Sequence, residues 1–462
     1  MRVTVLGAGY VGATSAAVLA YLGHDVTCVE REATRLACWR AGTDPLGEPG
    51  LAELLRSVRI RFVDEPSALA SSDVVIVAVG TPVGDEGYPD LTQLDAAALE
   101  IAELATSGTV VIMRSTVPVG TCDRLQDGPL RHVEVVSNPE FLREGRAIHD
   151  AFYPERIVAG GRAEARATVE ALYRGILEGR DLPGGDGYAR SVPMLWMSTR
   201  SAELAKYAAN GFLATKLSFV NEIANLAQVV GADASAVLGS MALDTRIGAH
   251  YLRPGLGWGG SCFPKDTRAL EAIANGEGYD FVVLRAAIDQ NAMQLQRFSE
   301  AIEAALPDRA RVAVLGLAFK AGTQDTRESP ALTLARRLVK SGLALTAYDP
   351  AVRDLPDDPS VLVRSSVAEA CAGADAVVVA TEWPEFAEID LGSLRQLMRG
   401  DLLFDGRSVV SPAAAEAAGF RYHGSSGLEQ NVRPMPRSRA ASARRRLRAL
   451  REPDLGLRHG AA

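Results

Sequence analysis

The chain has 462 residues, of which 47% are hydrophobic, and a formal net charge of -8. This length is too great for a single core and predicts two or three domains, while the negative charge argues against general nucleic-acid binding. No uncharged apolar run reaches the roughly 18 residues of a membrane span, and the chain opens on a strand without a signal peptide, so we expect a cytoplasmic protein with no membrane span.

The cysteine and histidine patterns do not suggest a metal site. The five cysteines are scattered and odd in number, without C-x-x-C spacing, and the six histidines form no paired ligand pattern. They indicate neither a disulfide framework nor a zinc site. We therefore expect no metal ion in the protein.

A strand-turn-helix-strand pattern opens the chain. The turn is Gly7-Ala8-Gly9-Tyr10-Val11-Gly12, and the second strand, over 25–29, ends at Glu30. The three glycines allow the tight turn, the approach of a pyrophosphate and close helix-strand packing. Glu30 would accept hydrogen bonds from the adenosine ribose and favours NAD over NADP, although Arg31 or Arg35 would be able to receive a 2′-phosphate.

Two further strands of this parallel sheet end in polar loops. An apolar run over 73–79 leads into Gly80-Thr81-Pro82, and a strand over 109–113 leads into a loop that contains Thr116. Because ligands bind at the carboxyl ends of parallel strands, Thr116 is a site candidate. A threonine after a strand is equally often a helix cap.

A pair of glutamates follows the next strand, over 133–136. Glu140 and Glu144 are four residues apart within Asn138 to Gly145. A helical turn would place both carboxylates on one face. The simpler reading is the solvated start of a helix, and the residues alone only slightly favour a site.

The apolar spacing over 201–230 predicts one helix of about 45 Å. A rod of this length between two α/β domains would serve as a spine and an oligomer surface. Lys206 and Asn210 form its polar i, i+4 pair. Lys206 would stabilise an alkoxide if it faced a cleft, whereas a lysine at a domain edge simply extends to solvent.

A glycine-rich loop over 255–266 carries Cys262 and, four residues later, Asp266. Glycines let the backbone approach a ligand closely. A lone cysteine is more often an inert core residue, but the neighbours of Cys262 are glycines, Ser261, Lys265 and Asp266 rather than an apolar run. The loop therefore indicates a nucleophile beside a carboxylate that handles water.

The second half repeats the opening in outline. A strand over 311–315, a helix over 331–339 and a strand over 345–348 predict another nucleotide-type domain without the full glycine triplet, with later strands over 376–380 and 402–404. Lys320 and Arg327 in its first loop, and Arg407 after its last predicted strand, would suit a phosphate. Surface salt bridges are the alternative.

From about Arg433 an arginine-rich tail begins, which we expect to be disordered or a loose helix.

These patterns predict an α/β protein with two Rossmann-like, doubly wound domains joined by a long central helix and a helical domain. We expect the domain boundaries at 1–198, 199–300, 301–432 and, for the tail, 433–462. A thiol beside a dinucleotide has a specific use. A thiolate that adds to an aldehyde gives a hemithioacetal, loss of hydride leaves a thioester, and water releases an acid.

The order of motifs resembles the UDP-glucose/GDP-mannose dehydrogenase family. The matching segments are GAGYVG at 7–12, GTP at 80–82, STVPVG at 115–120, NPEFLREG at 138–145, GGSCFPKD at 259–266 and DTRESP at 325–330. The resemblance covers about residues 1–430. It implies the oxidation of a nucleotide sugar at C6, from alcohol to carboxylate, with two NAD, in a homodimer or higher oligomer.

The resemblance also implies roles for individual residues. Cys262 would be the nucleophile, Lys206 and Asn210 would stabilise the C6 oxygen, Asp266 and Thr116 would hold a water, and Glu144 would be the base in thioester hydrolysis. The cofactor site would consist of Gly7, Gly9, Tyr10, Val11, Gly12, Glu30, Arg35, Thr81, Pro82, Thr116, Lys265 and Arg327. The substrate site would consist of Glu140, Phe141, Leu142, Glu144, Lys206, Asn210, Arg246, Tyr251, Gly259, Cys262, Lys320 and Arg407, with Arg246 reaching a neighbouring subunit's substrate.

The segments Tyr153 to Val158 and Phe404 to Arg407 are more similar to the enzymes of the family that act on UDP-glucose. We therefore expect a UDP-sugar as the partner and UDP-glucose as the substrate. The same chemistry on GDP-mannose or UDP-N-acetylmannosamine is the alternative. An NAD-retaining epimerase and a nucleotide-sugar sensor without turnover are rivals from other classes, and net formation of NADH and acid would exclude both.

Overall fold

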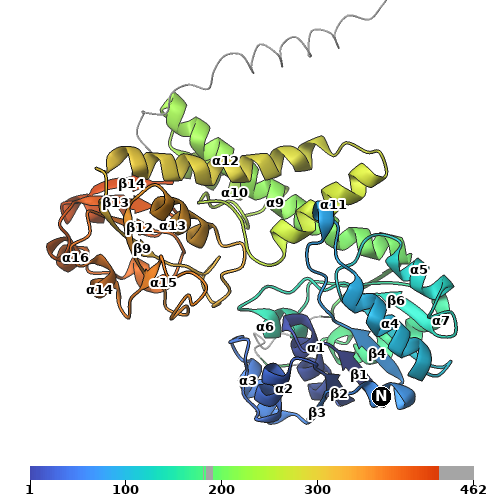
Figure 1. The fold of residues 1–462 in the computed structure, drawn as a ribbon. Helices are drawn as coiled ribbons and strands as arrows, with labels where there is room; N and C mark the ends of the chain where they lie inside the picture. Colours follow the sequence, from blue (N-terminus) through green and yellow to red (C-terminus); the bar gives the residue numbers. More distant parts are fainter. Residues whose placement is uncertain (181, 184–190, 426–462) are drawn as a thin grey trace, which may run out of the picture.

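The computed structural model describes residues 1–180, 182–183 and 191–425. The predicted tail over 433–462 lies outside these residues. Two α/β domains, coloured blue to teal and orange to red, are joined by long helices (Figure 1). This arrangement confirms the predicted fold class of two Rossmann-like domains around a helical centre.

The N-terminal domain is built on an eight-stranded sheet with the order β3-β2-β1-β4-β5-β6-β7-β8. Only the β6-β7 pair is antiparallel. The strands are β1 (Arg2–Leu6), β2 (Asp25–Val29), β3 (Ile60–Val63), β4 (Val74–Val77), β5 (Val110–Met113), β6 (Glu134–Ser137), β7 (Ile157–Gly160) and β8 (Met194–Met197). All four residues of β4 and of β5 are buried, as expected for parallel strands covered on both faces.

Helices cover both faces of this sheet. They are α1 (Tyr10–Tyr21), α2 (Ala33–Arg40), α3 (Leu51–Ser57), α4 (Thr92–Leu104), α5 (Thr121–Asp127), α6 (Ala147–Phe152), α7 (Ala163–Leu172) and α8 (Arg174–Leu177), with short 3-10 turns at Pro66–Ser71 and Asp85–Gly87. The strand order reverses between β1 and β4. A doubly wound sheet binds its ligand at such a switch point, and here the turn after β1 lies beside it.

The C-terminal domain repeats this plan with six parallel strands in the order β11-β10-β9-β12-β13-β14. The strands are β9 (Arg311–Leu315), β10 (Ala344–Tyr348), β11 (Leu362–Val363), β12 (Ala376–Val379), β13 (Leu402–Asp405) and β14 (Arg421–Gly424). The helices are α13 (Pro330–Lys340), α14 (Val367–Cys371), α15 (Pro384–Ala387), α16 (Leu391–Leu397) and α17 (Pro412–Ala417). The predicted repeat of the opening pattern is therefore present as a second sheet.

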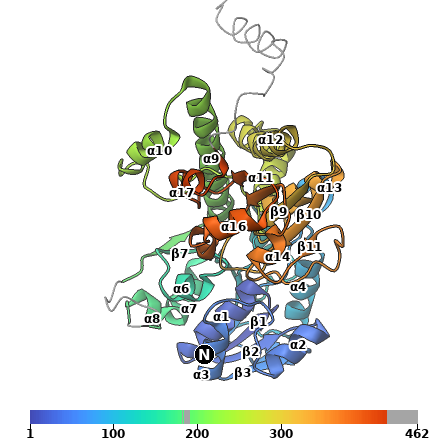
Figure 2. The same ribbon diagram turned by 90° about the vertical axis from the view of Figure 1, so that its left-hand side faces the viewer.

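Four helices join the domains: α9 (Thr199–Val230), α10 (Ala234–Ala242), α11 (Phe263–Gly276) and α12 (Val282–Ala305). The Ser198 hydroxyl caps α9 by accepting a hydrogen bond from the Ser201 amide, and Gly231 ends it in the left-handed conformation at φ 72°. The 32 residues of α9 confirm the predicted long helix. It packs against α11 and α12, and Figure 2 shows α9 and α12 above the N-terminal domain.

Two predictions of local structure were wrong. No helical turn forms over 140–144, because the side chains of Glu140 and Glu144 are drawn to different partners, Lys206 and Ser261. The strand predicted over 73–79 is shorter, because the chain leaves the sheet after Val77 to enter the ligand-side loop. Within the described residues, no helix is both long and apolar enough to cross a membrane.

Candidate active site

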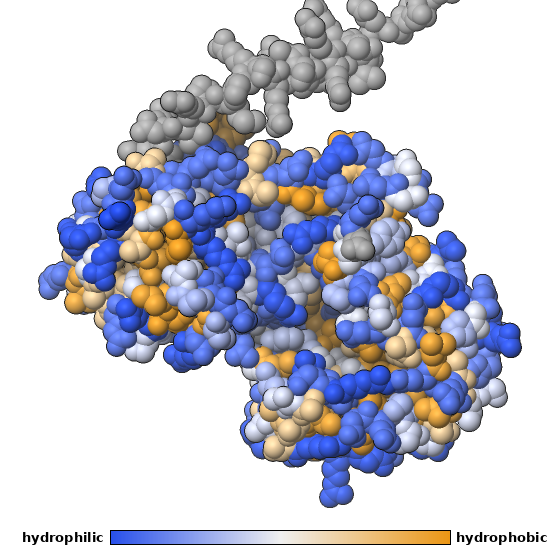
Figure 3. Space-filling model, viewed as in Figure 1, coloured by the Kyte–Doolittle hydropathy of each residue, from blue (hydrophilic) through white to orange (hydrophobic). Residues whose placement is uncertain are grey.

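Cys262 lies at the start of α11, in the loop that passes between the two domains. At two positions of this loop, the surrounding atoms leave no room for a side chain larger than that of glycine. A Cβ on Gly260 would lie 2.6 Å from a ring carbon of Phe319, and one on Gly259 would lie 2.1 Å from the Glu328 carbonyl oxygen. The loop thus fits tightly against the C-terminal domain, and the space-filling view shows a notch between the domains on this side (Figure 3).

A buried ion pair lies beside the thiol. Lys206 on α9 donates to Glu140 after β6, with 2.8 Å between Nζ and Oε1, and both side chains are almost fully buried. Burial by itself would lower the pKa of Lys206, but the carboxylates of Glu140 and Asp266 outweigh it and raise that pKa. Burial by itself would raise the pKa of Glu140, but the positive charge of Lys206 and the hydrogen bond from it outweigh burial and lower that pKa. Both groups are therefore charged.

One turn further along α9, Asn210 donates to Asp266 on α11, with 2.6 Å between Nδ2 and Oδ2. The other carboxylate oxygen of Asp266 accepts a hydrogen bond from Lys265 at 2.6 Å. The helix spacing of Lys206 and Asn210 thus places an ammonium and an amide on the face of α9 that looks toward the Cys262 loop. The predicted joint role of these two residues stays a prediction.

The Cys262 thiol is protonated at neutral pH. Burial raises its pKa to about 11, with Glu140 adding to the effect and Lys206 opposing it. The Ser261 hydroxyl lies 3.5 Å from the sulfur. A thiolate is the reactive form of cysteine, so the thiol needs a base before it can attack.

Glu144 lies on the other side of Ser261. Its Oε1 accepts a hydrogen bond from the Ser261 hydroxyl at 2.6 Å, and Arg327 approaches the same oxygen at 3.6 Å. Its Oε2 is buried without a hydrogen-bond donor. Burial raises the pKa of Glu144 to about 7, and the neighbouring Asp325 carboxylate contributes to this shift. The group is thus suited to take and release protons near neutral pH.

Thr116 lies in the loop after β5, where its carbonyl oxygen accepts a hydrogen bond from Thr81 at 2.9 Å. Within the described chain, Thr116 and Asp266 make no direct hydrogen bond. Pro82 is exposed beside Thr81. These three residues come from loops at the carboxyl ends of β4 and β5.

The turn after β1 fits a dinucleotide. A Cβ on Gly7 would lie 2.6 Å from the Ala78 carbonyl oxygen, and one on Gly12 would lie 1.8 Å from the Gly7 carbonyl oxygen, whereas Gly9 has nothing within 4 Å of a Cβ position. Open space therefore lies at the glycine that a pyrophosphate would approach. No side chain caps the N-terminus of α1, so its first amides are available to an anion.

The acid at the end of β2 is held in place by its neighbours. Glu30 is buried and accepts hydrogen bonds from the Ala8 amide at 3.3 Å and from Arg35 at 3.1 Å. Arg31 pairs with Glu100 instead. Tyr10 donates to the Leu46 carbonyl at 3.0 Å, and burial raises its pKa to about 12. Val11 is partly buried beside it.

The predicted cations Lys320 and Arg407 lie in the loops after β9 and β13 of the C-terminal domain. Lys320 lies 5.5 Å from the Phe319 ring centre, and burial lowers its pKa. Arg407 donates to the Ala380 carbonyl at 3.0 Å and pairs with Glu382 at 3.4 Å. Because these contacts use only part of the Arg407 guanidinium, the group can still meet a phosphate.

Other predicted substrate residues surround the ion pair. The Phe141 ring lies 4.1 Å from the Arg156 guanidinium and 5.4 Å from the Lys206 ammonium. The Leu142 amide donates to Glu140. Tyr251 has φ 60° and lies 6.2 Å from the Phe263 ring, which places it next to the Cys262 loop.

Arg246 is the predicted residue that the single chain does not bring to the site. It lies in a turn after α10, where its exposed side chain pairs with Asp244 at 2.6 Å. Within the described chain, it makes no contact with Cys262 or with Lys206.

Sequence reasoning missed several residues that hold the site together. Glu203 accepts hydrogen bonds from the Gly120 and Cys122 amides at 2.6 and 2.8 Å, and Glu48 accepts from the Gly145 and Ala147 amides at 2.7 and 2.6 Å. Ser261 and Asp325 were also not singled out. The position of Glu203, one helical turn before Lys206, was the available signal.

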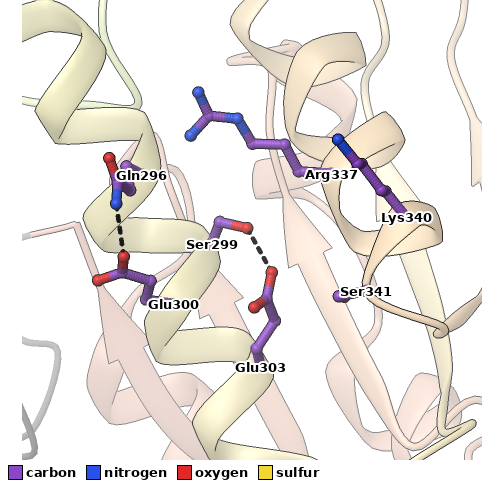
Figure 4. A pocket seen from close by; sticks show the side chains of 7 residues that line it. All are labelled: Gln296, Ser299, Glu300, Glu303, Arg337, Lys340 and Ser341. Carbon is purple, nitrogen blue, oxygen red and sulfur yellow. Dashed lines mark hydrogen bonds between the residues drawn. The ribbon is translucent and has the colours of Figure 1, made fainter.

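A separate surface pocket lies between α12 and α13 and has a volume of about 280 Å³ (Figure 4). Its walls include Glu300, Glu303, Arg337 and Lys340. This volume lies just below the roughly 300–1,000 Å³ of typical ligand pockets. Among the described residues, no group of three or more His, Cys, Asp or Glu side chains is placed to hold a metal ion.

The two sheets, the glycine turn and the acid at the end of β2 define a dinucleotide-dependent enzyme of the Rossmann class. Comparison with known proteins makes the assignment narrower. Three models of the UDP-glucose/GDP-mannose dehydrogenase family match the chain: its NAD binding domain at residues 1–177, its central domain at 200–293 and its UDP binding domain at 313–412.

Individual relatives agree with these matches. A UDP-glucose 6-dehydrogenase of Bacillus subtilis, YwqF, and one of Pseudomonas aeruginosa are each 40% identical, with 92% of this chain and 97% of the relative covered. A UDP-glucose dehydrogenase structure from Pyrobaculum islandicum is 34% identical, with a TM-score of 0.83, 92% of this chain and 97% of the other covered. The chain belongs to the UDP-glucose/GDP-mannose dehydrogenase family, and it is an NAD-dependent dehydrogenase.

Proposed function

We propose that this enzyme oxidises UDP-glucose at C6 to UDP-glucuronate, with two NAD per substrate, through a thioester on Cys262. The observation that carries the proposal is the convergence of the Cys262 thiol, the Lys206 ammonium and the Asn210-Asp266 pair between a dinucleotide-binding domain and a UDP-binding domain. The names of the relatives supply the sugar.

In the first oxidation, the C6 hydroxyl gives its proton to the water that Asp266 and Thr116 hold, and Lys206 and Asn210 stabilise the alkoxide oxygen that becomes the aldehyde oxygen. NAD, when bound, accepts the hydride from C6. Lys206 is suited to this because it is charged and fixed on α9 by Glu140. Phe141, Leu142, Tyr251 and Gly259 shape the wall around the sugar.

In the second oxidation, the Cys262 thiolate adds to the aldehyde, and hydride loss from the hemithioacetal leaves a thioester. Asp266 and Thr116 hold a water in the site, and Glu144 removes a proton from it as it attacks. The uronate then leaves and Cys262 is free again. The buried carboxyl of Glu144, with its pKa near 7, supports this role.

Two sets of residues bind the nucleotides. Gly7, Gly9 and Gly12 admit the NAD pyrophosphate, while Tyr10, Val11, Glu30, Arg35, Thr81, Pro82, Thr116, Lys265 and Arg327 complete the cofactor site. Lys320 and Arg407 bind the UDP end of the substrate through charge-assisted hydrogen bonds to its phosphates.

We also propose the domain limits 1–198, 199–300 and 301–432, and a cytoplasmic location.

The test is the stoichiometry of NADH. Two NADH per UDP-glucose consumed, with uronate as the product, supports the proposal, and one NADH means that the thiol step is absent. UDP-N-acetylmannosamine and GDP-mannose are run beside it. The first is a specific alternative, because a UDP-D-ManNAc dehydrogenase structure from Pyrococcus horikoshii is 30% identical with a TM-score of 0.80 and covers 92% of this chain and 99% of that one. Turnover of either sugar in place of UDP-glucose would move the assignment within the family.

Replacing Glu30 should weaken NAD binding. Glu30→Ala removes the acceptor for the ribose hydroxyls, and hydrogen bonds to charged groups contribute about 1.5–3 kcal/mol, so we expect the KM for NAD to rise about 10-fold or more. Because Arg35 loses its partner, use of NADP should rise relative to NAD. Glu32→Ala is the matched control, since Glu32 only caps α2. An unchanged KM in Glu30→Ala would contradict the assigned role.

We propose a homodimer formed along α9. Phe212, Phe219 and Leu226 are more than half exposed and seven residues apart, so they lie along one face of the helix. In such a dimer Arg246 would reach the partner's substrate. Phe219→Asp should give monomers in light scattering and lower the activity. The control Leu99→Asp, which changes an exposed side chain of α4, should stay dimeric. A wild-type monomer would refute the dimer.

A further inference from the structure

Ser261 contacts two residues of the proposed mechanism, Cys262 and Glu144, but that mechanism gives Ser261 itself no role. The Ser261 hydroxyl donates to Glu144 Oε1 at 2.6 Å, and its oxygen lies 3.5 Å from the Cys262 sulfur. A hydroxyl can donate one proton and accept another. Ser261 therefore connects the thiol to a carboxylate that does not itself touch the sulfur.

We propose that Ser261 carries the thiol proton of Cys262 to Glu144, so that these three residues form a relay that produces the attacking thiolate. In this step the S–H bond breaks and an O–H bond forms on Ser261, while the Ser261 proton passes to Glu144 Oε1. As the proton leaves, the sulfur electron pair forms the C–S bond to the aldehyde carbon, and the C=O π pair moves to the C6 oxygen, which Lys206 and Asn210 stabilise. The relay needs no oxidant or reductant, and the proton leaves Glu144 for solvent before water attacks.

The surroundings of Glu144 make it a suitable acceptor. Its Oε2 is buried without a donor, and an unpaired buried carboxylate oxygen favours the protonated form. The Asp325 carboxylate disfavours a negative charge on Glu144, whereas the positive charge of Arg327 opposes that effect. Tyr10 and Lys320 also interact electrostatically with Glu144. The resulting pKa of about 7 makes Glu144 a stronger base than an ordinary carboxylate. It still lies below the pKa of the thiol, so the proton transfer proceeds together with formation of the C–S bond, which consumes the thiolate.

The surroundings of the thiol show why an indirect base is needed. Glu140 and Asp266 raise the pKa of Cys262 through their charge, yet both are engaged, Glu140 by Lys206 and Asp266 by Asn210 and Lys265. Ser261 is the hydroxyl that the described structure places in contact with the sulfur.

This inference rests on the proposed function, and one experiment separates the two. Enzyme in excess over UDP-glucose is mixed with NAD, and NADH is followed in a stopped-flow instrument. General-acid-base assistance contributes about 10²–10⁴-fold to a rate. In Ser261→Ala we therefore expect the first NADH at a rate within three-fold of wild type and the second at least about 100-fold slower, as two phases of equal amplitude.

Further variants exclude a merely structural role. Ser261→Thr keeps the hydroxyl and should restore the second phase, and the pH dependence of that phase, which reports Glu144, should disappear in Ser261→Ala. Ser218→Ala is the matched control, because Ser218 holds the same loop by accepting a hydrogen bond from the Trp258 indole at 3.0 Å. In this variant the two NADH molecules should form as in wild type, without a separate slow phase. An unchanged second phase in Ser261→Ala overturns the relay, whereas wild-type enzyme that forms no NADH from UDP-glucose overturns the proposed function instead.

Discussion

Cys262→Ser should stop the enzyme between its two oxidations. Serine has the same shape, but its hydroxyl ionises far less readily than a thiol, and a relay whose final acceptor has a pKa of about 7 does not deprotonate it. We expect formation of uronate to fall by roughly 10³-fold or more, as when other enzymes lose their nucleophile. The measurement is uronate formed per unit time by chromatography.

The same variant should still carry out the first hydride transfer. Lys206, Asn210 and the NAD site are unaltered, so one NADH per UDP-glucose should appear in a single turnover, with the aldehyde trapped by a hydrazine. Cys122→Ser is the control for a general effect of removing a thiol, because Cys122 is a buried cysteine in the first turn of α5. If Cys262→Ser makes uronate at the wild-type rate, the thioester mechanism is wrong.

The sequence predicted the fold well where local pattern and tertiary structure agree. The opening strands over 2–6 and 25–29 have the predicted limits, and the long helix differs from its prediction by only two residues at its start. Glycine spacing and apolar periodicity are local properties, so they can be read without a structure. The edge strands β3 and β8 were missed because their burial is only partial, so they lack the apolar run of a buried strand. The buried strand β7 was also missed.

The site was less predictable, since its contacts join distant parts of the chain. The helical turn expected from the spacing of Glu140 and Glu144 does not exist, because Lys206, 66 residues away, and Ser261, 117 residues away, separate the two carboxylates. Spacing shows which side chains would share a face if a helix formed, but it does not show which partner is stronger. For the same reason, the sequence shows that Ser261 is next to Cys262, but it does not show that the Ser261 hydroxyl contacts Glu144.

The second large effect concerns the buried pair of Lys206 and Glu140. Lys206→Ala leaves the Glu140 carboxylate buried without its partner at 2.8 Å. Breaking a buried ion pair from one side costs about 3–5 kcal/mol, so we expect a loss of that size in the free energy of unfolding, measured in denaturant. Uronate formation should also fall at least about 100-fold, because the C6 oxygen loses its charged donor.

The double variant Lys206→Met with Glu140→Gln separates these two effects. It removes both charges at nearly constant volume, and replacing a buried pair by neutral groups is often nearly neutral for stability. We therefore expect most of the unfolding free energy to return while activity stays low. Recovery of activity together with stability would mean that Lys206 only supports the fold. Low stability in the double variant would mean instead that the packing around Phe141, rather than the charge, holds this part of the site together, since the Lys206 ammonium lies 5.4 Å from that ring.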